Sequence, residues 1–295
     1  MTNAPTSRRA YRNKRRAEDL AARENTPSRA GRNLPAAIGV GVGLVLVIMV
    51  SLFFWKPAFV IVLTAAAALA VTELIEALKE GRVNVPYVPV MGGTLVLGAT
   101  AYIAGTEGLA GGFALACLLV LVWRASERGE HALRDVAGGV FVLAYVPLLA
   151  GIAVLMVAED DGPARVLTFI LVTIASDTGG YMFGVLWGKR PMAPSLSPKK
   201  SWEGFTGSVV WSVAVGIAAV VLLLDGSWLV GVMVGVAAAC FATIGDLAES
   251  TLKRDLGIKD MGSILPGHGG IMDRMDSLLV VVPVTWALLT IFVPV

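Results

Sequence analysis

Residues 136–157 read VAGGVFVLAYVPLLAGIAVLMV, an apolar block that contains no charged side chain. An α-helix needs about 20 apolar residues to cross the roughly 30 Å hydrocarbon core of a bilayer. Comparable blocks recur along the chain and predict nine membrane helices, at residues 35–54, 58–78, 88–104, 108–123, 136–157, 166–187, 204–224, 228–247 and 277–295. The sequence therefore predicts an all-α, polytopic integral membrane protein with about nine transmembrane helices.

The composition supports the same class. Of the 295 residues, 56% are hydrophobic and 16% are charged, whereas soluble domains are about 45–50% apolar and about 25% charged. These values exclude a soluble enzyme, a disordered chain and a nucleic-acid binder with a basic surface. The two cysteines, Cys117 and Cys240, lie inside apolar blocks and predict no disulfide framework.

The distribution of Lys and Arg predicts the topology. With the N-terminus in the cytoplasm, 22 of the 24 Lys and Arg residues fall on the cytoplasmic side, and only Lys56 and Arg165 fall outside. Such an excess is typical of cytoplasmic segments. We therefore predict a multi-pass protein of the inner (plasma) membrane with a basic, disordered cytoplasmic leader at residues 1–33. The leader either fixes the topology or also binds anionic lipid headgroups.

The same topology divides the chain into two groups of helices. Residues 34–165 would hold about five N-terminal membrane helices, and residues 166–295 about four catalytic helices. The long polar connections, 188–203 and 248–276, belong to the second group and lie on the predicted cytoplasmic side. We therefore expect the active site to face the cytoplasm.

The connection before the last helix is rich in charged residues. Asp246, Glu249, Ser250 and Lys253 have the spacing i, i+3, i+4, i+7 and would share one stripe if their helix continues beyond the membrane. The segment 246–276 holds six acidic and four basic residues and one of the chain's two histidines. Interaction with a helix dipole or the setting of topology would explain some of these charges, but not their density.

The start of the last helix adds a glycine pair to these charges. Asp273 and Asp276 lie three residues apart in its first turn, with Arg274 between them and Gly269-Gly270 before them. Backbone N–H groups at a glycine-rich helix start attract anions, and carboxylates hold Mg²⁺. The pattern predicts metal-assisted chemistry on a phosphate ester.

Two further segments point to the same chemistry. Asp177 lies mid-way along an apolar block, where a carboxylate is costly, and this predicts a functional role. The segment Ser197–Gly204 opens the next helix and carries Lys199 and Lys200, which either anchor the topology or bind phosphate. Glu73 and Glu76, near one end of the second helix, are equally compatible with an interfacial position and with function.

The C-terminal residues resemble the signature of the phosphatidate cytidylyltransferase, or CDP-diacylglycerol synthase, family. The matching positions are Ser250-Thr251-Leu252-Lys253-Arg254, Lys259-Asp260, Gly262, Leu265-Pro266, His268-Gly269-Gly270-Ile271 and Asp273-Arg274-Met275-Asp276. The Ser197–Gly204 segment and the Ser176-Asp177-Thr178 segment resemble other recurring parts of that family. The resemblance covers residues 174–277 and is specific, because about fourteen constrained positions fall within 27 residues.

The resemblance implies that CTP and phosphatidic acid react to give CDP-diacylglycerol and pyrophosphate. It implies that Asp246, Asp273 and Asp276 hold Mg²⁺, with a second, monovalent cation such as K⁺ as an option. The implied catalytic residues are Asp246, Asp273, Asp276, Lys253 and Arg274. The implied substrate-binding residues are Ser197, Lys199, Lys200, Asp177, Arg254, Lys259, Asp260, His268, Gly269 and Gly270.

Three alternatives remain open at this point. A CTP-dependent polyprenol or phytol kinase would transfer the γ-phosphoryl group instead, although the full signature argues against it. An ion-coupled transporter would use Asp177 as its ion site, and a membrane scaffold would leave the acidic cluster unexplained. The expected partners are CTP, phosphatidic acid and membrane lipids, with no nucleic acid, and a homodimer is left open.

Overall fold

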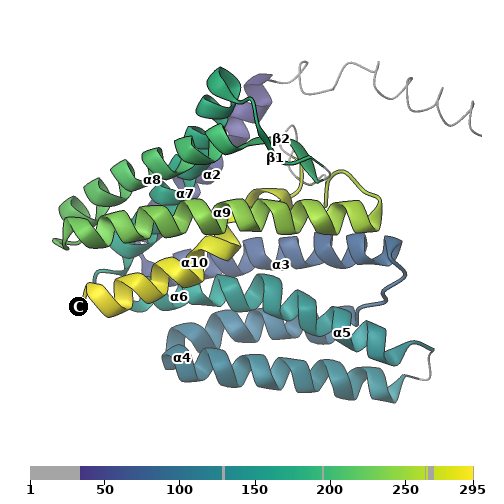
Figure 1. Cartoon of the computed structure of the whole chain (residues 1–295). Helices are drawn as coiled ribbons and strands as arrows, with labels where there is room; N and C mark the ends of the chain where they lie inside the picture. Colours follow the sequence, from purple (N-terminus) through teal and green to yellow (C-terminus); the bar gives the residue numbers. More distant parts are fainter. Residues whose placement is uncertain (1–33, 128–129, 195, 263, 265–268, 295) are drawn as a thin grey trace, which may run out of the picture.

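The computed structural model describes residues 34–127, 130–194, 196–262, 264 and 269–294. The predicted leader at residues 1–33 therefore lies outside the described residues. The elements, in chain order, are the helices α2 (Leu34–Phe54), α3 (Lys56–Glu80), α4 (Tyr87–Ser126), α5 (Ala132–Leu143), the π-helix Ala144–Leu148, α6 (Leu149–Ala158), α7 (Gly162–Trp187), the strands β1 (Pro191–Ala193) and β2 (Ser197–Ser201), and the helices α8 (Trp202–Leu223), α9 (Trp228–Leu256) and α10 (Met272–Phe292). The described part of the chain is a helical bundle with one short β-hairpin (Figure 1).

Seven helical segments of the described chain are long and apolar enough to cross a membrane. They correspond to α3, α4, the continuous run Ala132–Ala158, α7, α8, α9 and α10. Helix α2 is not among these seven, because the part of it whose side chains are described, Gly41–Phe54, is shorter than the other segments. The prediction of a multi-pass, all-α protein is confirmed at this level.

Helix α4 is interrupted at the place where the sequence separates two predicted helices. Ala104 and Gly105 have non-helical backbone angles, and Gly105 has a φ of +59°. A Cβ atom placed on Gly93 would lie 2.8 Å from the Cβ of Ala116, and one on Gly112 would lie 2.6 Å from the Thr100 hydroxyl. These contacts fold the two arms of α4 back on each other, as Figure 1 shows at the bottom of the bundle.

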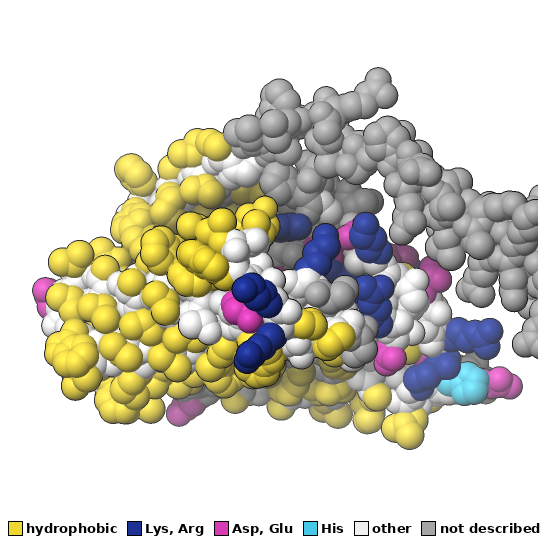
Figure 2. Space-filling model, turned by 45° about the horizontal axis from the view of Figure 1, so that its top comes forward, with side chains coloured by type: hydrophobic (Ala, Val, Ile, Leu, Met, Phe, Trp, Pro, Cys, Tyr) yellow, Lys and Arg dark blue, Asp and Glu magenta, His cyan; other side chains and the backbone are white. Residues whose placement is uncertain are grey.

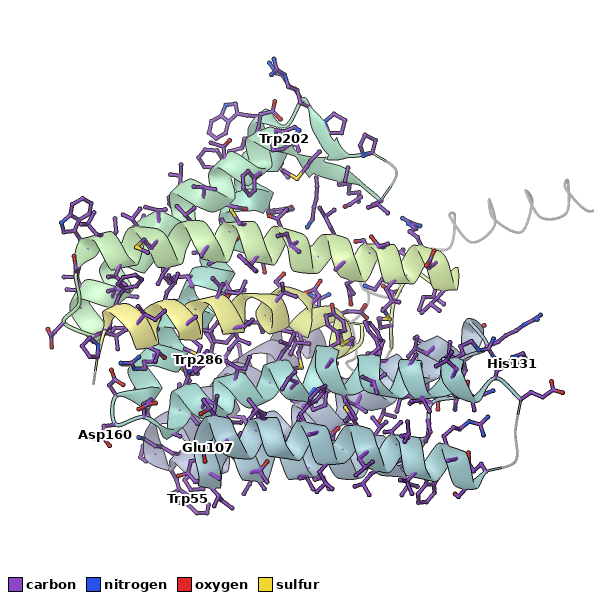
Figure 3. The ribbon with its side chains drawn as sticks, turned by 60° about the horizontal axis from the view of Figure 1, so that its bottom comes forward. Trp55, Glu107, His131, Asp160, Trp202 and Trp286 are labelled. Carbon is purple, nitrogen blue, oxygen red and sulfur yellow. The ribbon has the colours of Figure 1, made fainter. Side chains whose placement is uncertain are left out.

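Three of the connections that the predicted topology places outside the cytoplasm lie at one end of the bundle. Figure 3 shows Trp55, Glu107 and Asp160 together at this end, opposite His131. The ammonium group of Lys56 donates to the carbonyl of Glu159, and Arg165 donates from its Nη2 to the carbonyl of Val293 at 2.5 Å. The only two basic residues that the topology places outside therefore tie connections together at this end.

The surface separates apolar from charged side chains in the same way. Figure 2 shows apolar side chains over one part of the molecule and Lys and Arg side chains gathered over the rest. This separation is the one expected of a protein with one part in lipid and one in water.

The connections of the C-terminal half differ in detail from those predicted. The segment 188–203 contains the antiparallel pair β1–β2, which the apolar pattern did not predict. Helix α9 continues to Leu256 and α10 begins at Met272, so the second connection covers 257–271 rather than 248–276. Both helices include polar residues next to their predicted apolar blocks. The C-terminal end of α9 and the N-terminal end of α10 therefore lie outside those blocks.

Candidate functional site

A cavity of about 350 Å³ lies between α7, β2, α8, α9 and α10. Its walls combine four carboxylates with three basic side chains. The predicted site residues among its walls are Asp177, Lys199, Lys200, Asp246, Asp273, Arg274 and Asp276. The structure thus brings together residues that lie up to 99 positions apart in the sequence.

Helix α9 carries the predicted stripe of polar residues beyond the apolar region. Asp246 lies about 27 Å along the helix axis from Trp228, at 1.5 Å per residue, which is close to the full thickness of a bilayer core. Lys253 donates to Glu249 Oε2 at 2.6 Å, as the i, i+4 spacing predicts. The prediction that these side chains share one stripe is confirmed.

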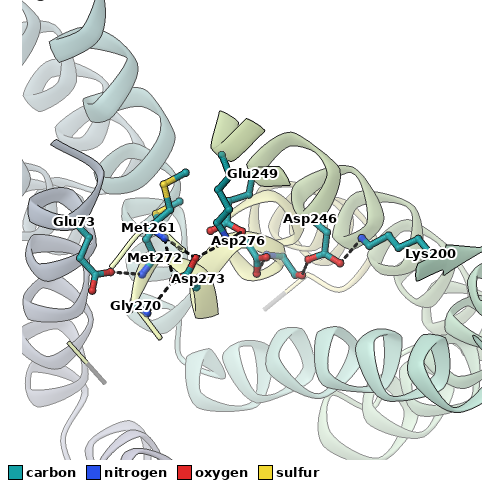
Figure 4. A network of polar contacts seen from close by, with 11 residues as sticks. Glu73, Lys200, Asp246, Glu249, Met261, Gly270, Met272, Asp273 and Asp276 are labelled. Carbon is teal, nitrogen blue, oxygen red and sulfur yellow. Dashed lines mark hydrogen bonds and ion pairs between the residues drawn. The ribbon is translucent and has the colours of Figure 1, made fainter. Parts of the chain in front are cut away.

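Three carboxyl groups lie in a row beside the cavity (Figure 4). Asp276 lies between Asp246 and Glu249, within hydrogen-bonding reach of both. Asp246 accepts hydrogen bonds from the Lys200 ammonium group and from the Ser277 hydroxyl, the latter at 2.7 Å. Carboxylates in such contact repel one another unless protons or cations intervene.

Asp273 organises the connection that precedes α10. Its carboxylate accepts hydrogen bonds from the backbone N–H groups of Met261 at 3.0 Å and Gly270 at 2.9 Å. The Lys253 ammonium group lies 2.5 Å from Asp273 Oδ1 and so links this carboxylate to Glu249. Asp273 is thereby held at the edge of the cavity by groups from both sides of the connection.

A second cavity, of about 280 Å³, adjoins the first and is basic. Lys199 lines both cavities and so lies between them. The other polar residues of the second cavity are Ser197, Ser250, Lys253, Arg254 and Lys259. No acidic side chain lines it among the described residues, so it suits an anion.

Of the remaining predicted residues, three do not line either cavity, and one lies outside the described residues. Gly269 has a φ of +82°, a conformation that favours glycine, and Gly270 is buried against Asp273. Asp260 is exposed and lines neither of these two cavities. His268 lies outside the described residues.

Four residues near Asp246, Asp273 and Asp276 are not among the predicted site residues, although the spacing already places Glu249 on the same stripe as Asp246. Ser277 and Glu249 contact them directly, and Tyr145 carries a buried hydroxyl with no hydrogen-bond partner among the described atoms. Tyr145 stands in the π-helix Ala144–Leu148, and its charged neighbours are Glu249, Asp276 and Asp246. π-Helices are frequent at functional sites. In the sequence, the sign that this helix is irregular is Pro147 within an apolar block.

Glu73 is the fourth of these residues and comes from the N-terminal half. Its side chain is buried, at 4% exposure, and its Oε2 accepts a hydrogen bond from the backbone N–H of Met272 at 2.9 Å. Glu73 therefore points into the protein, toward the start of α10, and not toward the surface. Glu76, one turn further along α3, is exposed and paired with Lys79.

The carboxylates fit a divalent cation by their chemistry. Within the described ranges, no three Asp, Glu, His or Cys side chains are already arranged as ligands of one metal ion. Mg²⁺ is commonly held by one or two carboxylates together with substrate phosphates, so a complete protein cage is not required. The row Asp246–Asp276–Glu249 offers oxygen donors whose mutual repulsion a cation would relieve.

Comparison with known proteins places these residues in a family. The profile of the cytidylyltransferase family matches residues 35–292. The chain is 39% identical over 285 residues to the phosphatidate cytidylyltransferase of Mycobacterium leprae, covering 91% of both chains.

Two further relatives carry the same name. The phosphatidate cytidylyltransferase of Mycobacterium tuberculosis (strain ATCC 25618 / H37Rv) is 37% identical over 278 residues, covering 90% of this chain and 84% of the relative. That of Staphylococcus aureus (strain COL) is 36% identical over 167 residues, covering 56% and 63%.

Proposed function

The chain belongs to the cytidylyltransferase family, and on that premise we propose that it transfers the cytidylyl group of CTP to phosphatidate. The products are CDP-diacylglycerol and pyrophosphate. The observation that carries this proposal is the pair of neighbouring cavities, one mixed in charge and one basic, beside a bundle of apolar helices.

The reaction needs positive charge more than it needs a base. The phosphate monoester of the lipid is already ionised near neutral pH, and one of its oxygens forms a bond to the α-phosphorus of CTP. The bond between that phosphorus and the bridging oxygen breaks, and pyrophosphate leaves. Two polyanions repel each other, so catalysis of this kind depends on positioning and on charge stabilisation.

The basic side chains are placed to supply that charge. Lys200 and Arg274 line the mixed cavity, Lys253 lines the basic cavity, and Lys199 lines both. Arg254 and Lys259 extend the basic cavity toward solvent, where a triphosphate would arrive. The helices α7–α10 would therefore form the catalytic part of the chain.

Asp246, Asp273 and Asp276 are the residues that would hold Mg²⁺, and a monovalent cation such as K⁺ is a second candidate for the same region. Mg²⁺ bound there would neutralise phosphate charge during the transfer. The contact of Asp276 with Asp246 supports this assignment, because two carboxylates so close together repel each other unless a proton or cation lies between them. Asp273 lines the same cavity. Activity that persists undiminished in excess EDTA would contradict it.

The lipid would reach the mixed cavity from the membrane side. Asp177 is exposed on α7 within the apolar part of the helix, and Tyr181, one turn further, is 74% exposed. Both line the cavity, so a polar headgroup can contact them while its acyl chains stay in lipid.

We also propose nine crossings, with the two arms of α4 counted separately and α2 included, and with the cavities on the cytoplasmic side of the plasma membrane. After replacement of Cys117 and Cys240, a single cysteine from Asp160→Cys should react with an impermeant maleimide in intact cells. One from Glu80→Cys, at the opposite end of α3 from Lys56, should react only after permeabilisation. Reversed labelling would overturn this orientation.

The activity itself is tested with purified protein, CTP, phosphatidate and Mg²⁺. Pyrophosphate should appear only when CTP and phosphatidate are both present, in equal amount to CDP-diacylglycerol. Nucleotide-independent flux of a solute in vesicles, without pyrophosphate, would favour the transporter alternative instead.

A further inference from the structure

The start of α10 is capped by a side chain from a distant helix. The first N–H groups of a helix lack partners within it, and the residue before the helix often supplies one. Here that residue is Ile271, which has no side-chain acceptor. The carboxylate of Glu73, on α3, accepts the N–H of Met272 instead, across 199 residues of sequence.

Two glycines of the connection pack around this carboxylate. A Cβ atom at Gly262 would overlap the Glu73 carboxylate, and one at Gly270 would lie 2.5 Å from its Oε2. Glu73 Oε1 is buried and has no hydrogen-bond partner among the described atoms. The two glycines thus leave room for a carboxylate, a group that is costly to bury. A side chain that only filled space would not need to carry this charge.

The carboxylates of Glu73 and Asp273 both lie against Gly270 (Figure 4). Gly270 donates its N–H to Asp273 Oδ2 at 2.9 Å, and its Cα faces Glu73 Oε2. Met272, which Glu73 caps, is the residue next to Asp273. Any shift of the helix start therefore moves Asp273 relative to the cavity that it lines.

We infer that Glu73 is a positioning residue, which anchors the start of α10 and thereby sets the place of Asp273 in the cavity. The consequence for turnover rests on the proposed function, but the anchoring itself does not. The inference also assigns a task to the N-terminal helices, since α3 supplies the anchor.

Glu73→Met and Glu73→Gln separate the role as acceptor from the filling of space, because both are similar in size to Glu. The glutamine carbonyl can still accept the Met272 N–H, whereas the methionine side chain offers only a weak acceptor. We expect Glu73→Met to lower kcat at least thirtyfold and Glu73→Gln to stay within about threefold of the unchanged protein. The matched controls, Glu76→Met and Glu76→Gln, should stay within about twofold.

Hydrogen exchange of the purified full-length protein measures the anchoring without reference to activity. Glu73→Met should raise exchange in peptides from residues 257–275 at least tenfold and leave peptides from α5 unchanged. Glu73→Gln should keep the protection. If exchange changes as expected but no CDP-diacylglycerol is ever formed, the anchoring role of Glu73 is supported and the proposed function is contradicted.

A glycine variant tests the same packing if Glu73→Met does not fold. Gly262→Ala should lower kcat at least tenfold, whereas Gly92→Ala, whose Cβ would meet nothing within 4 Å, should have no effect. Normal rates and normal protection in both Glu73→Met and Gly262→Ala would overturn the inference. Equal loss in Glu73→Met and Glu73→Gln would also overturn it, because the Met272 N–H would then not be the relevant partner.

Discussion

Two clusters of charged side chains lie in the two halves of this protein, and they are built in opposite ways. In the N-terminal half, Arg124 donates from Nε and Nη2 to Asp135 Oδ2, at 3.1 and 2.8 Å. The other oxygen of Asp135 accepts the backbone N–H of Asn84 at 2.9 Å. Both side chains are at least 91% buried, and neither lines any of the cavities described above.

The C-terminal cluster is neither matched in charge nor closed. Asp276 contacts both Asp246 and Glu249, and two cavities open beside them. One buried oxygen of Glu249 has no hydrogen-bond partner among the described atoms. A matched and closed ion pair serves the fold, whereas unmatched charges beside a cavity are suited to a charged ligand. On this difference we propose that the first cluster serves stability and the second serves chemistry.

The largest expected effect is that of Asp273→Asn on turnover. The change keeps the size of the side chain but removes the charge that faces Lys253 and the cavity. We expect the rate at saturating Mg²⁺ to fall about a thousandfold, equivalent to about 4 kcal/mol of transition-state stabilisation. Normal insertion and an unchanged elution profile would show that the fold is retained, and a wild-type rate would refute the assignment.

Arg124→Met should have the opposite signature. It removes two hydrogen bonds to the buried Asp135 and leaves the Asn84 N–H and the Arg134 guanidinium group, at 3.9 Å, to offset its charge, which costs about 3 kcal/mol of unfolding free energy. The rate per folded molecule should not change. Unfolding in detergent measures the first quantity, and Arg124→Met/Asp135→Leu should regain most of the stability. A loss of rate without a loss of stability would mean that this cluster also takes part in chemistry.

Lys200→Met tests whether the basic side chains of the mixed cavity act on substrate. Lys200 pairs with Asp246 and lines the cavity, so its removal should lower kcat about thirtyfold, or about 2 kcal/mol. Lys79→Met is the matched control, because Lys79 pairs with Glu76 on the exposed face of α3. Equal effects of the two substitutions would show that net charge, and not the cavity, determines the rate.

Gly105→Ala should produce the smallest effect, and only on stability. Gly105, at the turn between the arms of α4, combines a φ of +59° with a ψ of −143°, a conformation that disfavours any residue with a Cβ by about 1–3 kcal/mol. Thermal unfolding should report that loss, while kcat remains within experimental scatter. A marked fall in kcat would link the N-terminal helices to catalysis by more than the Glu73 contact.

Much of the fold could be predicted from the sequence, because the signals for its helices and turns are local. Apolar blocks predicted the helices, and the glycine at 105 separated the two arms of α4. The spacing of Asp246, Glu249 and Lys253 predicted their shared stripe, and the distribution of Lys and Arg matched the two ends of the bundle. Each of these features depends on the periodicity or charge of a single segment.

The remaining features depend on contacts between distant segments. Nothing near Glu73 indicates that it caps a helix 199 residues away, and the isolated serine at 277 gives no sign that it donates to Asp246. The β1–β2 pair lies in a polar connection without the alternation typical of strands. The pairing of Lys200 with Asp246 also needed the structure, since the two residues meet only across β2 and α9.

The central claim is that the unmatched cluster transfers a cytidylyl group. CTP labelled at either the α- or the γ-phosphorus, incubated with phosphatidate, Mg²⁺ and the purified protein, tests it most directly. The α-label should enter the lipid product and the γ-label should leave as pyrophosphate, with neither result obtained for Asp273→Asn. Transfer of the γ-label to a lipid, with release of CDP, would identify a kinase and contradict the account.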